Sequence, residues 1–310
     1  GYYNKPHMDM IDLFIGSDGT LGIISEIEIE LNKTQDACWG VTIFMPDEDK
    51  AINLVRALRG ETIFSNIAPL KLSPSAIEFF SHKALDMLRI QQRTNPAFSC
   101  IQEIKDNYHT AVYIEIEGDS NEEIWEGIEE LGTTIVLLGG DEDATWVANN
   151  PLNLEKLHSF RHACPECVNM QIDNAKKIDE RITKLGTDMS VPDDKLKEVM
   201  KMYNDDIKKN KLEAVIFGHI GNNHLHVNTI PRNIEEYNTG KELYLIWAEK
   251  IAEMGGAVSA EHGVGKLKVP FLQKMYSDKE LDEMRKIKKI FDPAQLFNRG
   301  AVFPYEKEGK

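Results

Sequence analysis

The chain has 310 residues, of which 51 are acidic and 36 basic, so its formal net charge is −15 at pH 7. This length allows one large domain or two ordinary ones, and a hydrophobic share of 42% is typical of globular proteins. The negative charge argues against nucleic acid or an anionic membrane surface as the main partner. No apolar run approaches the ~20 residues that a membrane-spanning helix needs.

The four cysteines are too few to form a disulfide scaffold in a chain of this length, which indicates a reducing, cytoplasmic compartment. Cys164 and Cys167 form a CxxC pair, but no second pair accompanies them. Two incidental thiols near a helix are therefore favoured over a redox or zinc role.

The first part of the chain predicts short strands around a glycine-rich turn, followed by a strand and a helix. The expected elements are a strand at 11–15, a turn at 16–22, a half-buried strand at 23–31, a strand at 39–45, and a helix at 47–59 that starts at Asp47.

The middle of the chain alternates strand and helix patterns. The expected elements are an extended stretch at 68–73, a helix from Ser75, an irregular stretch at 92–110, a strand at 110–118, a helix at 121–132 ended by Gly132, a strand at 134–138, and a helix at 144–163 interrupted near Pro151. This order predicts an α+β fold, in which an antiparallel sheet carries helices on one face as in ferredoxin-like domains.

The last part combines two long helices with a hairpin. The expected elements are a strand at 185–192, a helix at 193–210, a hairpin of 213–221 with 224–230, a helix at 233–254 stopped by Gly255 and Gly256, and a helix at 278–290. No internal repeat is visible.

The hairpin sequence GHIGNNHLHVN gathers three of the nine histidines. Residues two apart share a face of a strand, so His224, His226 and Asn228 are expected on one face. His219 ends the preceding strand, and the turn brings it back towards His226. Two imidazoles from adjacent strands can then reach one metal ion, at ~2.0–2.1 Å each for zinc.

A third ligand is available in the sequence AEHGVG, where Glu261 and His262 lie on a glycine-bounded loop. Two histidines and one carboxylate with an open position are typical of a catalytic divalent-metal site. Ordinary surface or core histidines remain the alternative, and the spacing alone leaves the two interpretations about even. His224 is either a fourth ligand or points away.

Five motifs carry a family resemblance over residues 9–304. They are DLFIGSDGTLGIISEIEIEL, LGTDMSVP, GHIGNNHLHVN, SAEHGVGKLKVPF and FDPAQLFNRGAVF. In this order they resemble FAD-linked oxidases of the vanillyl-alcohol-oxidase type, in the branch of D-lactate, glycolate and other D-2-hydroxyacid dehydrogenases. No one motif would suffice alone.

The resemblance implies a division into three parts. Residues 1–34 resemble the end of a PCMH-type FAD-binding domain, 35–270 the substrate or cap domain, that is, the FAD-linked oxidase C-terminal domain, and 271–310 a C-terminal helical tail that returns to the flavin. Family members begin with a longer FAD-binding half. We therefore expect this chain to be a fragment, or to work with a separate chain that supplies that half, because no GxGxxG or P-loop is present to replace it.

The resemblance also implies FAD and a divalent metal, with zinc preferred over manganese or iron. It assigns His262 as the base for the substrate hydroxyl, and Arg161 and Asn228 as substrate-binding residues beside His262. The implied metal ligands are His219, His226 and Glu261. The implied flavin-contacting residues are Gly16, Gly19, Gly22, Ile23 and Asn298.

Three departures from the family pattern affect the interpretation. The usual Asp-Gly-Asn of the metal motif is here Asn222-Asn223-His224, and Arg299-Gly300-Ala301 stands where the family has Pro-Gly-Lys. Gly186 stands where 2-hydroxyglutarate enzymes carry a lysine for the far carboxylate, which favours a small monocarboxylate, although Lys184 is nearby.

The expected function is therefore the substrate- and metal-binding part of a FAD-dependent D-2-hydroxyacid dehydrogenase, which oxidises a lactate- or glycolate-like substrate to a 2-oxoacid. A non-catalytic partner subunit that binds metal and hydroxyacid is the alternative. An electron-transfer protein or a quinone is the expected acceptor, and no nucleic acid is expected. The expected location is the cytoplasm, with membrane association through the acceptor as the alternative.

Overall fold

The computed structural model describes residues 2–65 and 69–304. Its chain forms two compact units, which we treat separately. The sheet unit comprises Lys33–Thr187 and Asp193–Lys241, and the helical unit comprises Gly1–Asn32, Asp188–Pro192 and Glu242–Lys310.

The sheet unit is built on antiparallel strands in the order β4-β1-β3-β2-β7-β8-β5. Their bounds are β1 Ala37–Met45, β2 Pro74–Phe80, β3 Thr110–Gly118, β4 Trp146–Ala148, β5 Leu185–Gly186, β7 Ala214–Gly218 and β8 His224–Thr229. The longest pairing joins β1 to β3, from Ala37 opposite Gly118 to Met45 opposite Thr110.

Nine α-helices lie in the part of the chain that the structure describes. Their bounds are α1 Met10–Phe14, α2 Glu48–Leu58, α3 His82–Thr94, α4 Asn121–Leu137, α5 Pro151–Ile178, α6 Leu196–Lys209, α7 Ile234–Glu253, α8 Val269–Met275 and α9 Asp278–Phe291. Short 3₁₀ turns lie at Pro96–Phe98, Glu142–Ala144, Asp193–Lys195 and Ile220–Asn222.

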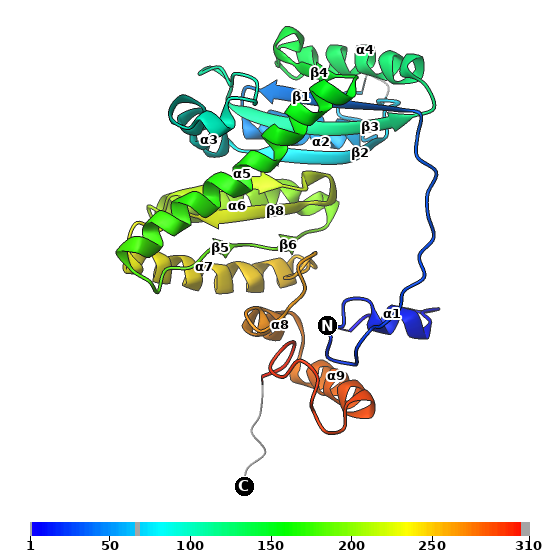
Figure 1. Ribbon diagram of the computed structural model, residues 1–310, viewed down its shortest axis with the longest axis vertical. Helices are drawn as coiled ribbons and strands as arrows, with labels where there is room; N and C mark the ends of the chain where they lie inside the picture. The colour runs from blue at the N-terminus through cyan, green and yellow to red at the C-terminus, as the bar shows by residue number, and fades with distance from the viewer. Residues whose placement is uncertain (1, 66–68, 305–310) are drawn as a thin grey trace. The chain divides into compact units, whose positions relative to one another are not determined.

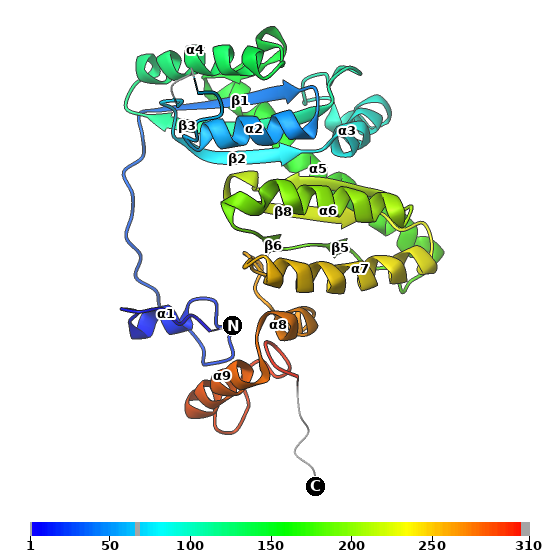
Figure 2. The same cartoon turned by 180° about the vertical axis from the view of Figure 1, so that it is seen from behind.

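The predicted class, a mixed fold of helices and an antiparallel sheet, is confirmed. The expectation that helices would occupy one face is the part that differs. Within the sheet unit, α5 crosses one face of the strands (Figure 1), and α2 and α6 lie over the other (Figure 2). Eight of the nine residues of β1 are buried, because helices on both faces exclude water from both rows of its side chains.

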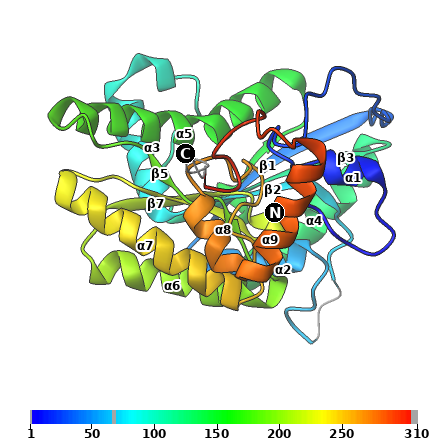
Figure 3. The same ribbon diagram turned by 90° about the horizontal axis from the view of Figure 1, so that it is seen from below.

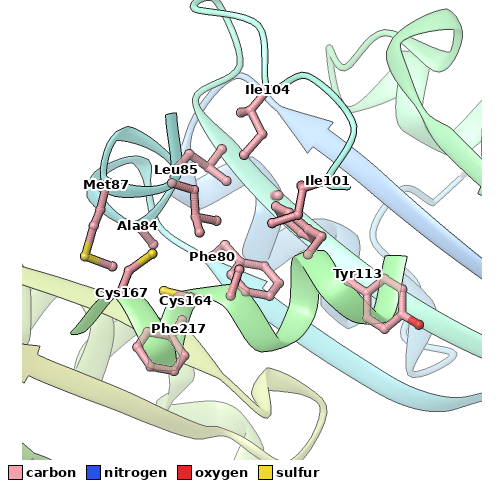
Figure 4. Packing of buried hydrophobic residues seen from close by; sticks show 14 of the residues in the cluster. Phe80, Ala84, Leu85, Met87, Ile101, Ile104, Tyr113, Cys164, Cys167 and Phe217 are labelled. Carbon is pink, nitrogen blue, oxygen red and sulfur yellow. The ribbon is translucent and has the colours of Figure 1, made fainter. Parts of the chain in front are cut away.

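The hydrophobic core of the sheet unit lies between α3, α5 and the strands (Figure 4). Phe160 at its centre is fully buried, and its ring centroid lies 4.7 Å from that of Phe80 and 5.5 Å from that of Trp146. Cys164 and Cys167 are free thiols in the same cluster. Burial raises the pKa of both, to about 12 for Cys167, so they pack as apolar side chains and are poor nucleophiles.

Several predicted elements are confirmed because local signals agree with the packing. The side chain of Asp47 accepts a hydrogen bond from the amide of Lys50 at 2.8 Å and starts α2, as predicted. The strands expected at 39–45 and 110–118, the helices at 193–210, 233–254 and 278–290, and the histidine hairpin also form. Pro151, expected to interrupt a helix, begins α5 instead, because a first-turn proline has no amide to satisfy.

Three predictions in the middle of the chain are wrong. The first residues of the helix expected at 144–163 form strand β4, which pairs with β1. The helix expected from Ser75 is strand β2, whose residues pair with β3 and β7, and the helix begins only after Ser81. Pairing on both sides overrides the helical pattern of the sequence here. The strand expected at 134–138 is the end of α4, which continues through Gly132. A side chain on Gly132 would meet Glu142, so this glycine allows a close approach and does not end the helix.

The helical unit has its own core, to which helices α1, α8 and α9 contribute side chains. Figure 3 labels these three helices. Residues expected as a strand at 11–15 form α1 instead, because Asp9 and Asp12 make a capping box at its start. The strand expected at 23–31 pairs with no other strand among the described residues, and its side chains are exposed. β6, Met189–Ser190, is bridged to Ala257.

No helix among the described residues combines the length and apolar character needed to cross a bilayer.

Candidate functional site

The histidine hairpin is the centre of the candidate site. β7 and β8 pair antiparallel, with Phe217 opposite His226, and a 3₁₀ turn joins them. Asn223 ends that turn in the left-handed region at φ +53°, which asparagine tolerates better than most residues. The turn is therefore stable without the glycine that the family motif carries.

Arg59 holds this turn from the end of α2. Its guanidinium donates to the backbone oxygens of Ile220 and Gly221 and, at 2.6 Å, to Oδ1 of Asn223. Nδ2 of Asn223 donates to Asp193 at 2.6 Å. These four hydrogen bonds fix the connection on which the spacing of the histidines depends.

The three imidazoles of the hairpin converge. The ring centroids of His224 and His226 are 4.5 Å apart, and that of His219 lies 5.5 Å from each of them. A ring nitrogen of each lies within 4.8 Å of one from each of the others. The predicted approach of His219 to His226 is therefore present, and His224 joins them on the same side.

Two of these rings are oriented by hydrogen bonds at Nδ1. Nδ1 of His219 lies 2.9 Å from Oε1 of Glu78, and Nδ1 of His226 lies 2.9 Å from the backbone oxygen of Thr187. Both partners are acceptors, so each Nδ1 carries the proton and Nε2 carries the lone pair. A carboxylate or carbonyl behind each histidine is the usual support of metal-binding imidazoles, so this donor set fits a divalent ion.

Gly218, the first residue of the motif GHIGNNHLHVN, lies against the ring of His226. Its φ is +123°, and a Cβ there would come within 2.7 Å of Cδ2 of His226. Any side chain at this position would displace the imidazole, so the glycine makes room for the ring.

Arg161 reaches the same face of the sheet from α5. Its guanidinium donates to Glu78 at 2.5 Å and to Glu115 at 3.1 Å. The Glu78 side chain is 5% exposed and that of Arg161 28%. Glu78 therefore links the arginine to His219, and Arg161 balances one of two carboxylates beside the histidines.

Asn228 and Gly186 lie opposite each other on β8 and β5. Asn228 is buried, and a Cβ on Gly186 would come within 2.7 Å of its Oδ1. The side chain of Asn228 thus fills the space that a larger residue at 186 would need.

Glu261 and His262 belong to the helical unit. Their amides donate to the carboxylate of Asp188, and Nε2 of His262 lies 3.1 Å from Oε1 of Glu261. Asp188, Glu261 and His262 each offer a ligand atom within 4.8 Å of the others. The participation of Glu261 in a metal site stays a prediction.

The residues predicted to contact the flavin also lie in the helical unit. Gly16 and Gly19 have φ values of +73° and +64°, and a Cβ on either, or on Gly22, would meet no atom within 4 Å. Asn298 donates to the backbone oxygen of Asp18, which joins the tail to this turn. Ile23 is exposed. An accessible glycine-rich backbone suits the edge of a planar cofactor, so these residues fit part of a flavin site.

Several supporting residues were not predicted from the sequence. They are Arg59, Glu78, Glu115, Thr187, Asp188 and Lys268. All act through pairings distant in the chain, and a lone acidic or basic residue gives no local signal of such a role. Thr187, Asp188 and Lys268 lie within the motifs quoted above, whereas Arg59, Glu78 and Glu115 lie outside them.

Comparison with known proteins identifies the family. The family model described as "FAD linked oxidases, C-terminal domain" matches residues 42–302. Among solved structures, 4-ethylphenol oxidase from Gulosibacter chungangensis, in its isoeugenol complex, is similar in fold with a TM-score of 0.57 and 13% identity, covering 88% of this chain and 55% of that one. p-Cresol methylhydroxylase with bound substrate is also similar, with a TM-score of 0.54 and 14% identity over 87% of this chain and 53% of that one.

Three curated relatives are similar over nearly the whole chain. Glycolate oxidase subunit GlcD of Bacillus subtilis is 26% identical, covering 95% of this chain and 57% of that protein. D-2-hydroxyglutarate dehydrogenase of Stutzerimonas stutzeri is 25% identical, covering 97% of this chain and 60% of that protein. D-lactate dehydrogenase of Anaerostipes hadrus is also 25% identical, covering 94% of this chain and 58% of that protein. The chain spans less than two thirds of the length of each. With the family model matching most of its residues, the chain belongs to the FAD-linked oxidases, as their C-terminal domain.

Proposed function

We propose that this chain is the substrate- and metal-binding part of a FAD-dependent D-2-hydroxyacid dehydrogenase that produces a 2-oxoacid. The observation that carries the proposal is the paired orientation of His219 and His226 by acceptors at Nδ1. The relatives named as glycolate, D-lactate and D-2-hydroxyglutarate enzymes support the reaction class.

In this proposal His219, His226 and Glu261 hold a divalent ion, with zinc preferred over manganese or iron. Such an ion would act as a Lewis acid towards the substrate hydroxyl. Gly16, Gly19, Gly22, Ile23 and Asn298 contact FAD, which when bound supplies the acceptor for the hydride from C2.

The remaining steps belong to side chains of this chain. Arg161 binds the substrate carboxylate with its planar guanidinium, sharing its donors with Glu78 and Glu115. Asn228 hydrogen-bonds the substrate, and an imidazole nitrogen of His262 takes the hydroxyl proton. Because Asn228 fills the space beside Gly186, we propose a small, lactate- or glycolate-like monocarboxylate over a dicarboxylate.

The proposed domains are residues 1–34 as the end of a FAD-binding domain, 35–270 as the substrate domain, and 271–310 as a tail that returns to the flavin. The remaining FAD-binding half would come from further residues of the same protein or from a partner subunit. A quinone or an electron-transfer protein would accept the electrons, with the protein in the cytoplasm or associated with a membrane through that acceptor.

The test is a paired measurement on the purified chain: metal content by mass spectrometry and flavin by visible absorption. About one equivalent of metal per chain is expected, with tight binding lost in His219→Ala and Glu261→Ala. His162→Ala is the matched control, because His162 is an exposed histidine of α5. Unchanged metal content in both site variants would refute the metal assignment.

A second arm distinguishes the catalytic from the non-catalytic function. Added FAD in the presence of D-lactate or glycolate should be bleached by reduction if the chain turns over hydroxyacid. Metal and hydroxyacid binding without bleaching, even after the FAD-binding half is supplied, would favour a non-catalytic partner subunit.

A further inference from the structure

We propose that Asp188 and Lys268 are positioning residues that set the geometry of the loop carrying Glu261 and His262. The inference rests on the proposed function for the roles of those two side chains. It concerns atoms of the helical unit alone, where the segment of Asp188 and the loop meet.

Asp188 accepts several hydrogen bonds from the loop that carries Glu261 and His262. It is 2% exposed, and its carboxylate accepts hydrogen bonds from the amides of Glu261, at 3.2 Å, and His262, at 3.1 Å. The hydroxyl of Ser259 donates to the same carboxylate at 3.0 Å. Amides of two consecutive residues bound to one carboxylate fix the direction in which both side chains leave the backbone.

Lys268 neutralises the buried carboxylate of Asp188 and also binds the loop at Ser259 and Gly263. Its Nζ pairs with Asp188 and also donates to Oγ of Ser259 at 3.0 Å and to the backbone oxygen of Gly263 at 2.9 Å. A buried carboxylate is costly unless it is paired and fully hydrogen-bonded. Here one cation supplies the charge and also binds both ends of the turn.

Asp18 anchors the following part of the loop. Its Oδ2 accepts from the amides of Val264, at 2.9 Å, and Gly265, at 2.8 Å. Four amides between 261 and 265 are thus bound by two aspartates from distant parts of the chain, and Gly263 between them adopts a φ of +71°. The conformation of the loop is therefore imposed from outside.

Asp188 holds the loop through hydrogen bonds from its backbone amides. Its Oδ1 lies 3.6 Å from Nδ1 of His262, too far for a hydrogen bond. A general role in folding would not require a charge, because an apolar pair commonly replaces a buried ion pair without loss of stability. Hydrogen bonds from two adjacent amides do require an acceptor at this point.

The experiment compares four forms of the chain: wild type, Asp188→Asn, the double variant Asp188→Asn/Lys268→Met, and Asp282→Asn. Asp282 is exposed in the same unit and pairs only with Arg285 among its described contacts, so it serves as the matched control. Hydrogen exchange of peptides covering 259–265, Zn²⁺ affinity by calorimetry and melting temperature are measured on each form.

We expect exchange of at least one of the Glu261 and His262 amides to accelerate about tenfold or more in Asp188→Asn, because asparagine keeps only one of the two acceptor oxygens. Zn²⁺ affinity should fall about 10- to 100-fold, as for other residues that support metal ligands. The double variant removes the charge imbalance and should recover melting temperature without recovering Zn²⁺ affinity. Asp282→Asn should match the wild type in all three measurements.

Unchanged exchange at these two amides overturns the proposal, whatever the metal does. Wild-type Zn²⁺ affinity in the double variant overturns it as well, because Asp188 would then serve folding alone. A wild-type chain that binds no Zn²⁺ refutes the proposed metal site instead, and the exchange measurement still decides whether Asp188 sets the loop.

Discussion

The two compact units differ in how completely they cover their own apolar surface. Among the described residues, 21 large apolar side chains are exposed, and 14 of them lie in the helical unit, which is about a third of the chain. These 14 are Tyr3, Met10, Ile11, Ile15, Ile23, Ile24, Ile27, Ile29, Leu31, Leu245, Ile246, Leu267, Ile290 and Leu296.

The sheet unit buries most of its large apolar side chains within itself, whereas the helical unit leaves many of them exposed. In the sheet unit, helices close both faces of the strands, and few large apolar groups remain outside. In the helical unit, residues 23–31 alternate apolar and acidic side chains without a strand partner among the described residues. Such a segment is suited to add to the edge of another sheet.

The largest expected effect tests the self-sufficiency of the sheet unit. Phe160→Ala removes a fully buried ring from the centre of its core and should lower the free energy of unfolding by about 3–5 kcal/mol. Urea denaturation followed by circular dichroism measures this loss. A change below about 1 kcal/mol would mean that the core between α3, α5 and the strands does not hold this unit together.

The next effect concerns charge on the α5 face of the sheet. Arg161→Met leaves the carboxylates of Glu78 and Glu115 without their shared cation and should cost about 2–3 kcal/mol, less than a fully buried pair because Arg161 is partly exposed. The matched control is Arg181→Met, since Arg181 forms an exposed pair with Asp179. Equal stability of the two variants would show that the ion pairs of Arg161 with Glu78 and Glu115 do not stabilise the fold.

A smaller effect tests the helical unit through Asp292. Burial would raise the pKa of this carboxyl, but hydrogen bonds from Lys288 and from the amides of Leu296 and Phe297 lower it to about 2. Because the folded pKa is depressed, the stabilisation is present above the unfolded value near 4 and is lost as pH falls towards 2.

Asp292→Asn should therefore lower stability by about 2 kcal/mol at pH 7, with little difference from the wild type near pH 2. Differential scanning calorimetry from pH 7 to pH 2 measures the difference. A gap that stays constant over this range would show that the charge of Asp292 does not stabilise the tail.

The smallest effect on stability is expected in the exposed segment. Ile27 is 71% and Ile29 70% exposed, so replacing both with serine should change the free energy of unfolding by less than about 0.5 kcal/mol. Dye binding to apolar surface should decrease in the same variant. A loss above 1 kcal/mol would show that the chain itself covers this segment in solution.

Elements with strong local signals were predictable from the sequence. The alternation of 110–118, the cap at Asp47 and the histidine hairpin were all visible there, and all form. The strand at 74–80 is not predictable in this way, because its apolar pattern suits a helix and only pairing with β3 and β7 makes it a strand. The capping box of α1 is visible in the sequence as Asp9 and Asp12, and it is the signal that distinguishes this helix from the expected strand.

The candidate site was predictable in its motifs but not in its supports. His219 and His226 come from one short hairpin, so spacing alone brings them together. Glu78 reaches His219 across 141 positions and Lys268 reaches Asp188 across 80, distances over which a single sequence carries no signal.

The junction of β2 with β7 has a consequence for synthesis of the chain. Phe79 and Phe80 of β2 pair with Gly218 and Phe217 of β7, and the other edge of β2 pairs with β3. During translation β7 leaves the ribosome about a hundred residues after β3, so one edge of β2 stays unpaired over that interval. At ribosomal speed this interval lasts on the order of ten seconds, during which a nascent half-sheet has an open, aromatic edge. Chaperone demand during translation should therefore peak between the emergence of residue 118 and that of residue 218.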